Sequence, residues 1–314
     1  MLWRQSAPSK EYQIHPLDAT VSHTEFAILP TAAIWYAEAN FGNEGSMMIV
    51  AAAYVPNTPT IIPLAEKAPG FLPHTAIHTA LQQVGQAWRQ RGIDALITVS
   101  PHFQGWHQIP MAKASPVPLI YDYDGFPDAY YDIAYHPTED AALVEQILTS
   151  PSTRSRIAST TRWGLDHGAF GPLMNLDPEA HWPIVPFGIA RFLDLAEHVA
   201  FGQALEIATG SRQVALVATG SLLHRLDYWG HPPDQLDDET LNALDAVIAR
   251  LLAADWDALW HMPDDWMKRL APEGDLKPLA VLSGALSTPI RTHHWAHALE
   301  YQAASLDVVT FESD

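Results

Sequence analysis

The stretch Met48-Ile49-Val50-Ala51-Ala52-Ala53-Tyr54-Val55 is a continuous apolar run, and Pro56-Asn57-Thr58-Pro59 ends it. A short apolar run closed by prolines is typical of a strand that is buried on both faces. Downstream, one helix face is marked by Ile77, Leu81, Val84 and Trp88, and Gly92 follows as a stop signal. A second buried strand is predicted over residues 95–99. A strand, a helix and a strand with short connections indicate parallel pairing through a right-handed crossover.

The same pattern recurs in the second half of the chain. Residues 184–189 and 214–218 are predicted to be buried strands, with a helix between them over about residues 194–207. Another amphipathic helix is predicted over residues 241–252. We therefore expect one α/β domain over residues 48–314, with a mainly parallel central sheet flanked by helices. Residues 1–47 show no sustained periodicity and are predicted to be an N-terminal extension.

The composition narrows the classes of function. The 314 residues include 36 acids against 17 lysines and arginines, and a formal charge of −19 argues against nucleic acid and anionic membrane partners. No apolar run is long enough to span a bilayer, so we expect a cytoplasmic protein. The chain has no cysteine, and any metal must therefore be bound by histidine, carboxylate or amide groups.

Polar side chains follow several of the predicted strands. Asn57, His102 and His224 each come after an apolar run, and ligands of open α/β sheets bind beyond the carboxyl ends of the strands. Glu273 precedes another apolar stretch. Two histidines and a carboxylate on one face of a non-haem Fe(II) ion leave positions open for substrate and dioxygen. His102 and Glu273 could be ligands of this kind, which leaves His167 and His224 for proton transfer.

The segment Trp163-Gly164-Leu165-Asp166-His167-Gly168-Ala169-Phe170 is predicted to be a tight loop, because Gly168 favours a backbone conformation that other residues avoid. In such a loop, His167 beside the Asp166 carboxylate could exchange protons near neutral pH. Taken alone, the segment is better explained by a surface turn. Structural roles also stay open for the others: His102 could cap a helix, His224 could bond the backbone and Glu273 could be a solvated acid.

Six short motifs follow one another along the chain: Pro56-Asn57-Thr58-Pro59, Ser100-Pro101-His102, Tyr121-Asp122-Tyr123-Asp124-Gly125-Phe126-Pro127, Leu165-Asp166-His167-Gly168, Gly220-Ser221-Leu222-Leu223-His224 and Pro272-Glu273-Gly274. Their order over about residues 48–286 resembles the class III extradiol ring-cleavage dioxygenases. This family includes protocatechuate 4,5-dioxygenase catalytic subunits, 2-aminophenol 1,6-dioxygenases and Memo-type proteins. The resemblance implies a single α/β domain that binds Fe(II) through two histidines and a glutamate.

The resemblance also implies roles for individual residues. His102 and Glu273 match two of the Fe(II) ligands, His167 matches an acid/base histidine, and His224 matches a histidine that contacts substrate or oxygen. The residues expected to bind the substrate are Tyr123, Phe126 and Asp166.

Asn57 departs from the family pattern, since the family has its first ligand histidine there. An amide oxygen is a weaker ligand for Fe(II) than an imidazole, so iron bound by Asn57, His102 and Glu273 is expected to be held less tightly. By proximity in sequence alone, His74 and His78 are candidates to replace the missing ligand.

The sequence thus predicts an Fe(II)-dependent extradiol dioxygenase that opens a catechol or 2-aminophenol ring with dioxygen, in the catabolism of aromatic compounds. We expect a homo-oligomer or a hetero-oligomer with a homologous subunit. Two alternatives stay open. Asn57 favours a non-catalytic partner subunit with a degenerate metal site, whereas a His, Glu and Asn site could also hold zinc in a non-oxidative enzyme.

Two further patterns lie outside these motifs. Asp234, Asp237, Asp238 and Glu239 are predicted to begin a helix, where acids favour the helix dipole. The spacing of His293, His294 and His297 suits a helix, and we interpret them as a solvated helix face.

Overall fold

The computed structural model describes residues 49–64, 74–229, 233, 235–286 and 289–313, and the structural statements below concern these residues. The predicted N-terminal extension over residues 1–47 lies outside them, so the boundary at residue 48 stays a prediction. None of the described helices has the length and apolar composition needed to cross a membrane.

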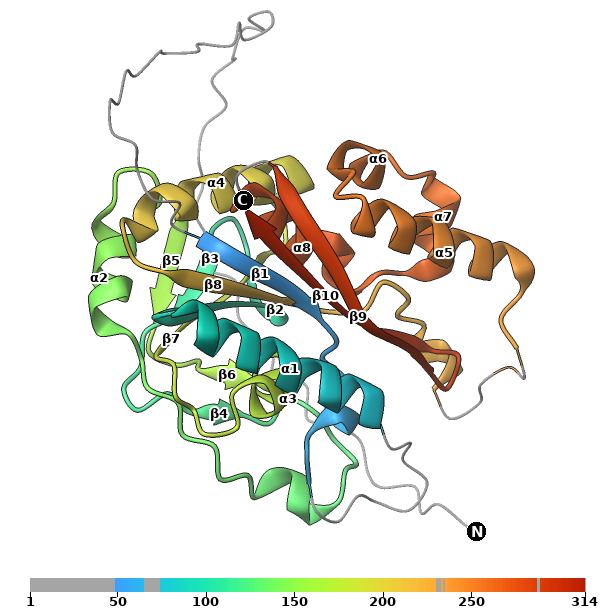
Figure 1. The fold of residues 1–314 in the computed structure, drawn as a ribbon, viewed down its shortest axis with the longest axis horizontal. Helices are drawn as coiled ribbons and strands as arrows, with labels where there is room; N and C mark the ends of the chain where they lie inside the picture. Colours follow the sequence, from blue (N-terminus) through green and yellow to red (C-terminus); the bar gives the residue numbers. More distant parts are fainter. Residues whose placement is uncertain (1–48, 65–73, 230–232, 234, 287–288, 314) are drawn as a thin grey trace, which may run out of the picture. The chain divides into compact units, whose positions relative to one another are not determined.

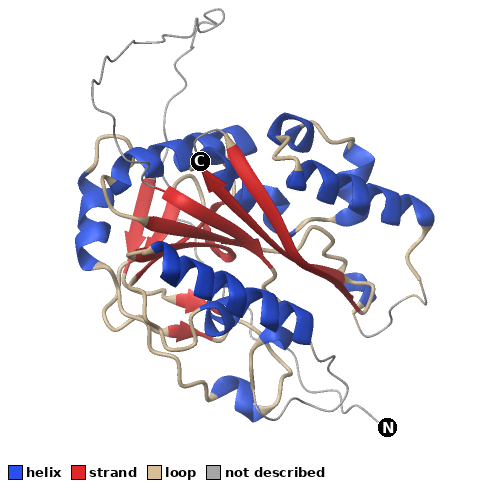
Figure 2. Cartoon of the chain, in the orientation of Figure 1, coloured by secondary structure: helices blue, strands red, loops and turns tan. Residues whose placement is uncertain are grey.

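A central eight-stranded sheet has the order β5-β3-β7-β2-β8-β1-β10-β9 (Figure 1, Figure 2). Its middle strands run parallel: β7 (Ile184–Ala190), β2 (Ala95–Gly105), β8 (Val214–Thr219) and β1 (Ile49–Val55). On one side the sheet continues with the antiparallel strands β10 (Ala304–Ser313) and β9 (Ile290–Glu300). On the other side it continues with β3 (Ile109–Ala112), antiparallel to β7, and β5 (Ile157–Thr160), parallel to β3. The predicted α/β fold with a mainly parallel sheet is confirmed.

Alternate side chains of the central strands enter two separate hydrophobic cores. In β1, Ala52 and Tyr54 belong to one core, whereas Ala51, Ala53 and Val55 belong to the other. Successive side chains of a strand point to opposite faces of the sheet, so both faces of β1 are covered. This double burial explains why the strand is apolar at every position.

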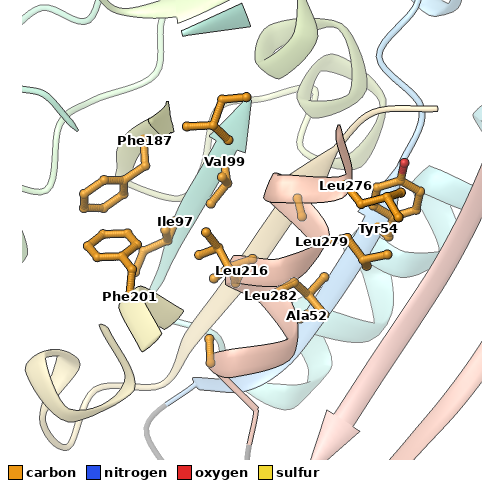
Figure 3. Packing of buried hydrophobic residues seen from close by; sticks show 14 of the residues in the cluster. Ala52, Tyr54, Ile97, Val99, Phe187, Phe201, Leu216, Leu276, Leu279 and Leu282 are labelled. Atoms are coloured by element: carbon orange, nitrogen blue, oxygen red, sulfur yellow. The ribbon is translucent and has the colours of Figure 1, made fainter. Parts of the chain in front are cut away.

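Helices cover both faces of the sheet. The first core includes residues of six helices: α2 (Ala141–Thr149), α4 (Leu195–Thr209), α5 (Asp238–Leu252), α6 (Trp256–Trp260), α7 (Asp264–Leu270) and α8 (Lys277–Gly284). Figure 3 shows Leu279 and Leu282 of α8 packed toward Ala52 and Leu216 of the sheet. The second core includes residues of α1 (Thr75–Arg91) and α3 (His167–Leu176).

The predicted helix ends agree with the structure. Gly92 ends α1 in the left-handed conformation, with a φ of 78°. Asp194 caps α4 through a reciprocal capping box with Glu197. Asp237 accepts a hydrogen bond from Thr240 N at the start of α5, and Asp238 and Glu239 lie in its first turn, which confirms the helix start at these acids. Asp234 lies outside the described residues.

Three local predictions were wrong. The second strand was predicted to cover residues 95–99, but β2 continues to Gly105 and contains Ser100 and His102. Its pairing with β7 shifts between Val99 and Gln104. Residues 163–170 are not a loop: they contain the short strand β6 (Leu165–Asp166) and the first turns of α3.

The third wrong prediction is the helix face of His293, His294 and His297, which lie on β9. Because β9 has one extra residue, Trp295, opposite the step from Val308 to Val309 of β10, the regular alternation of the pair is interrupted. His297 Nδ1 and His294 Nε2 consequently lie 2.8 and 3.6 Å from the same Asp307 oxygen.

Candidate metal and substrate site

The site lies beyond the carboxyl ends of the central parallel strands. Asn57 follows β1, His102 lies in the irregular end of β2, and Ser221 follows β8. Glu273 begins a 3-10 segment, Glu273–Leu276, and its backbone N–H donates to the Ser221 carbonyl. A cavity of about 290 Å³ lies here and is lined by Asn57, Thr58, Pro59, His102, Tyr123, Asp124, Phe126, His167, Ser221, His224, Leu226, Trp229, Glu273 and Ala304.

A second, two-stranded sheet brings Asp122 to His167. Strand β4 (Leu119–Ile120) pairs in parallel with β6, with Ile120 opposite Asp166. The residues that follow the two strands are therefore neighbours. Asp122 Oδ1 accepts a hydrogen bond from the backbone N–H of His167 at 3.0 Å and lies 2.7 Å from Nδ1 of the same residue.

His102 is held between two carboxylates. Its Nδ1 lies 2.9 Å from Asp122 Oδ2, and its Nε2 lies 2.9 Å from Glu273 Oε1. The imidazoles of His102 and His167 are neighbours, with ring centroids 4.2 Å apart. His224 Nε2 lies 4.0 Å from the same Glu273 oxygen. The structure thus brings three histidines and two acids together from five separate segments.

The charges of this cluster stabilise one another. Burial lowers the pKa of His102, but the hydrogen bonds to Asp122 and Glu273 outweigh burial and raise this pKa to about 11. Burial raises the pKa of Glu273, whereas the hydrogen bond from His102 and the charge of His224 bring it down to about 2. Burial also raises the pKa of Asp122, but His102 and His167 hold it well below its usual range. Without a metal, His102 is therefore an imidazolium between two carboxylates.

Asp166 was predicted to bind substrate, but it does not line the cavity, and we therefore do not propose this role. Its side chain is buried, and Oδ1 accepts hydrogen bonds from Ser100 Oγ at 2.6 Å and from Ala169 N at 3.2 Å. Its other oxygen accepts from Trp163 Nε1 at 3.2 Å. Oδ1 therefore fixes the start of α3 to β2, and the second oxygen is occupied by Trp163.

Gly168 is required for close packing. A β-carbon at this position would lie 2.8 Å from Ser100 Oγ, 2.9 Å from His102 Cδ2 and 3.0 Å from Asp166 Oδ1. Its φ is not positive, so the sequence-based reason given for this glycine was wrong. The absence of a side chain lets α3 begin directly against His102.

The backbone after Glu273 is strained. Gly274, Asp275 and Leu276 have φ values of 60°, 53° and 61°, in the left-handed region that Asp and Leu rarely adopt. Strain of this kind concentrates at functional sites, where the surrounding structure holds it. Here it turns the chain sharply, so that Glu273 lies beside His102 while α8 begins only a few residues later.

The donor set fits a metal ion. Asn57 is buried, its Nδ2 makes no regular hydrogen bond, and Glu273 Oε2 is likewise buried without a hydrogen-bond partner. The Asn57 amide nevertheless lies near enough to help lower the pKa of Glu273. Imidazole nitrogen with carboxylate and amide oxygen is a ligand set that first-row divalent metals accept.

Asp122 supports His102 in this arrangement. A metal-binding histidine typically uses its second nitrogen on a carboxylate, as His102 Nδ1 does with Asp122. One ligand atom each from His102, Asp122 and His167 also lie within 4.8 Å of one another. However, both Asp122 oxygens already contact imidazole nitrogens, which favours Asp122 as the support rather than the ligand.

His74 and His78 do not line the cavity. His74 Nε2 lies 2.9 Å from Glu300 Oε1 and 3.2 Å from Thr60 Oγ1, in a buried cluster. Neither residue is therefore placed as a substitute for the histidine that the family has at Asn57.

Tyr123 and Phe126 do line the cavity, as expected from the resemblance. Their ring centroids lie 5.1 Å apart, and the Tyr123 ring lies 5.2 Å from that of His167. The Tyr123 hydroxyl donates to the Tyr130 carbonyl, which fixes the orientation of the ring.

Asp122 is a site residue that was not predicted from the sequence. The residue lies inside one of the quoted motifs, Tyr121-Asp122-Tyr123, where an acid alternates with aromatic residues. Its contacts with His102 and His167 depend on the pairing of β4 with β6, which the sequence does not reveal.

Comparison with known proteins gives the family. Residues 51–306 match the family described as the catalytic LigB subunit of aromatic ring-opening dioxygenase. The chain belongs to this family. Among solved structures, an uncharacterized protein from Escherichia coli K12 matches 83% of this chain and 99% of its own, with a TM-score of 0.58. At 18% identity this match supports the fold alone.

Curated relatives match part of the chain. A protein of Escherichia coli K12 named 4,5-DOPA dioxygenase extradiol is 32% identical over 150 residues, which are 45% of this chain and 53% of that protein. A Beta vulgaris protein of the same name is 29% identical over 154 residues, 47% of this chain and 56% of that protein. The chain thus spans about half the length of these curated relatives.

Proposed function

We propose that this protein is a metal-dependent dioxygenase that opens the ring of a catechol- or 2-aminophenol-type substrate with dioxygen. One observation supports this proposal most directly. His102 Nε2, Glu273 Oε1 and His224 Nε2 lie close together in a cavity that is also lined by aromatic residues. Membership of the ring-opening dioxygenase family supports the same reaction class.

The proposed metal is Fe(II), held by His102, Glu273 and the Asn57 amide oxygen. When bound, iron supplies Lewis acidity and electron transfer between the ring and dioxygen. His102 would bind the metal through a deprotonated Nε2, with Nδ1 still held by Asp122. Because an amide is a weaker ligand than an imidazole, iron affinity is expected to be modest.

His167 is the proposed acid/base. Asp122 Oδ1 holds its Nδ1, which leaves Nε2 as the nitrogen that can accept a proton from a substrate hydroxyl or amine. Asp122 also stabilises the imidazolium that forms, so the proton can later be returned. His224, whose Nε2 lies 4.0 Å from Glu273 Oε1, is proposed to contact substrate or oxygen, and Tyr123 and Phe126 are proposed to pack against the ring.

The test combines iron content with oxygen uptake. Protein purified without oxygen and loaded with Fe(II) is expected to consume oxygen with catechols or aminophenols. His167→Ala is expected to abolish turnover with nearly normal iron content, whereas His102→Ala is expected to lose both. The exposed His261, which does not line the cavity, provides the control His261→Ala. Oxygen uptake by His167→Ala at the wild-type rate would disprove the acid/base role.

A second candidate function is that of a partner subunit without its own ring-opening activity. Asn57 favours it, because the site offers one imidazole fewer than the family pattern. Iron-loaded protein that consumes no oxygen alone, but does so after addition of a homologous subunit, would support this alternative.

A further inference from the structure

The cavity has a buried floor and an exposed rim. The floor includes Asn57, Ser221, His167 and Glu273, which are 3%, 1%, 5% and 8% exposed. The rim includes Leu226 and Trp229, which are 61% and 36% exposed, and the exposed residue Asp124. A ring whose adjacent donors reach Glu273 and His102 must therefore direct its distal substituent toward the rim.

At the rim, the described charges are unfavourable for an anion. Among the described residues that line the cavity there is no lysine or arginine, whereas Asp124 contributes a carboxylate at the rim. Asp124 Oδ1 accepts a hydrogen bond from Gly125 N at 2.8 Å, which holds this carboxylate in place.

The arginine nearest in sequence to the rim is already paired. Arg225 Nε and Nη2 donate to the two Asp227 oxygens at 2.8 and 2.7 Å, and Nη1 donates to the Arg269 carbonyl at 3.2 Å. Its guanidinium also stacks over the Tyr228 ring at 4.2 Å. To bind a substrate carboxylate, Arg225 would have to break this bidentate pair.

From these observations we propose that the cavity accepts rings whose distal substituent is neutral or cationic and discriminates against rings that carry a carboxylate. The inference rests on the proposed function for the position of the ring. A carboxylate among Phe126, Tyr123 and Trp229 would lose water without gaining a lysine or arginine partner from the described residues that line the cavity. An ammonium group would instead gain the field of Asp124 and the faces of these aromatic rings.

The test uses three catechols that share one scaffold and differ in charge: dopamine, 4-ethylcatechol and 3-(3,4-dihydroxyphenyl)propionate. Their dissociation constants are measured on the iron-loaded protein without oxygen, and oxygen uptake is measured separately. The propionate is expected to bind at least about tenfold more weakly than 4-ethylcatechol. Dopamine is expected to bind several-fold more tightly, since an exposed charge contributes modestly.

Two variants identify the source of the preference. Asp124→Asn keeps an oxygen that can accept from Gly125 N and is expected to remove the difference between dopamine and 4-ethylcatechol. Asp128→Asn changes an exposed acid of the same segment that does not line the cavity, and is expected to preserve it.

The outcomes separate this inference from the proposed function. If the propionate binds as tightly as 4-ethylcatechol, or if Asp128→Asn acts like Asp124→Asn, the charge selection is wrong even where every ring consumes oxygen. If the binding order holds but no ring consumes oxygen, the ring-opening proposal fails and the charge selection stands.

Discussion

At the scale of single residues, Asp122 decides how two imidazoles of the site are presented. One of its oxygens holds His102 Nδ1 and the other holds His167 Nδ1. Each imidazole therefore keeps its Nε2 for other partners. A proposed metal ligand and a proposed proton carrier thus depend on the same carboxylate.

Replacing this carboxylate should weaken metal binding without unfolding the protein. Asp122→Asn can no longer accept from both imidazoles, so we expect iron affinity to fall by about 10- to 100-fold, as for other residues that support metal ligands. Competition with a coloured chelator measures the change. Asp128→Asn is the control, and an unchanged iron affinity in Asp122→Asn would contradict the supporting role.

A substitution at Asn57 should have the opposite effect and strengthen metal binding. Asn57→His introduces an imidazole next to Glu273, whose Oε2 has no hydrogen-bond partner, and we expect tighter iron binding because imidazole is the stronger ligand. The same chelator titration measures it. Equal affinities in wild type and variant would show that position 57 does not contact the metal.

At the scale of elements, the start of α3 against β2 assembles the site. Asp166 caps this helix and also bonds Ser100, so helix and strand are joined at the positions that carry His167 and His102. The close approach depends on Gly168, which has no side chain to separate them.

A methyl group at Gly168 should therefore disturb the site. In Gly168→Ala, contacts of 2.8 to 3.0 Å force Ser100, His102 or Asp166 to move, and we expect a loss of roughly 1–3 kcal/mol in unfolding free energy. Urea denaturation measures this loss. Gly171→Ala in the same helix is the control, because its nearest contacts are 3.5 and 3.8 Å and alanine favours helix. Equal stabilities of the two variants would refute the close-packing argument.

At the scale of the whole molecule, the His102 and Glu273 pair links stability to pH. The pKa of His102 rises from 6.5 to about 11 on folding, so its contribution is complete below pH 6.5 and is lost as pH rises toward 11. The pKa of Glu273 falls from 4.5 to about 2, so its contribution is complete above pH 4.5 and is lost as pH falls toward 2.

The metal-free protein should thus gain most from this pair between about pH 4.5 and 6.5. Unfolding free energies across the pH range test this expectation. His102→Gln removes the titrating imidazole and should flatten the alkaline decline, whereas His261→Gln at an exposed position should not. An alkaline decline of wild-type size in His102→Gln would disprove the assignment.

The centre of the fold could be predicted from the sequence, because a strand that is buried on both faces appears there as a continuous apolar run. Strand β1 is apolar at every position, and α1 shows a regular apolar face. The edge strand β9 lacks this pattern. Its histidines have helical spacing, but an extra residue in the strand shifts the pairing register and brings His294 and His297 to the same acid.

The site was predictable only in part, for a related reason. His102, His167, His224 and Glu273 are marked by short motifs, and the structure brings them together. The role of Asp122 and the burial of Asp166 depend on contacts between segments far apart in the chain, which local patterns do not encode. Sequence patterns thus identified the reactive groups better than the residues that position them.

Sharing one acid between His102 and His167 has a consequence for mutational analysis. Substitution of Asp122 should be strongly non-additive with substitution of either histidine, because loss of Asp122 already releases both imidazoles from their anchor. Losses measured one at a time would then sum to more than the whole. A double-mutant cycle, rather than an alanine scan, is the appropriate way to apportion them.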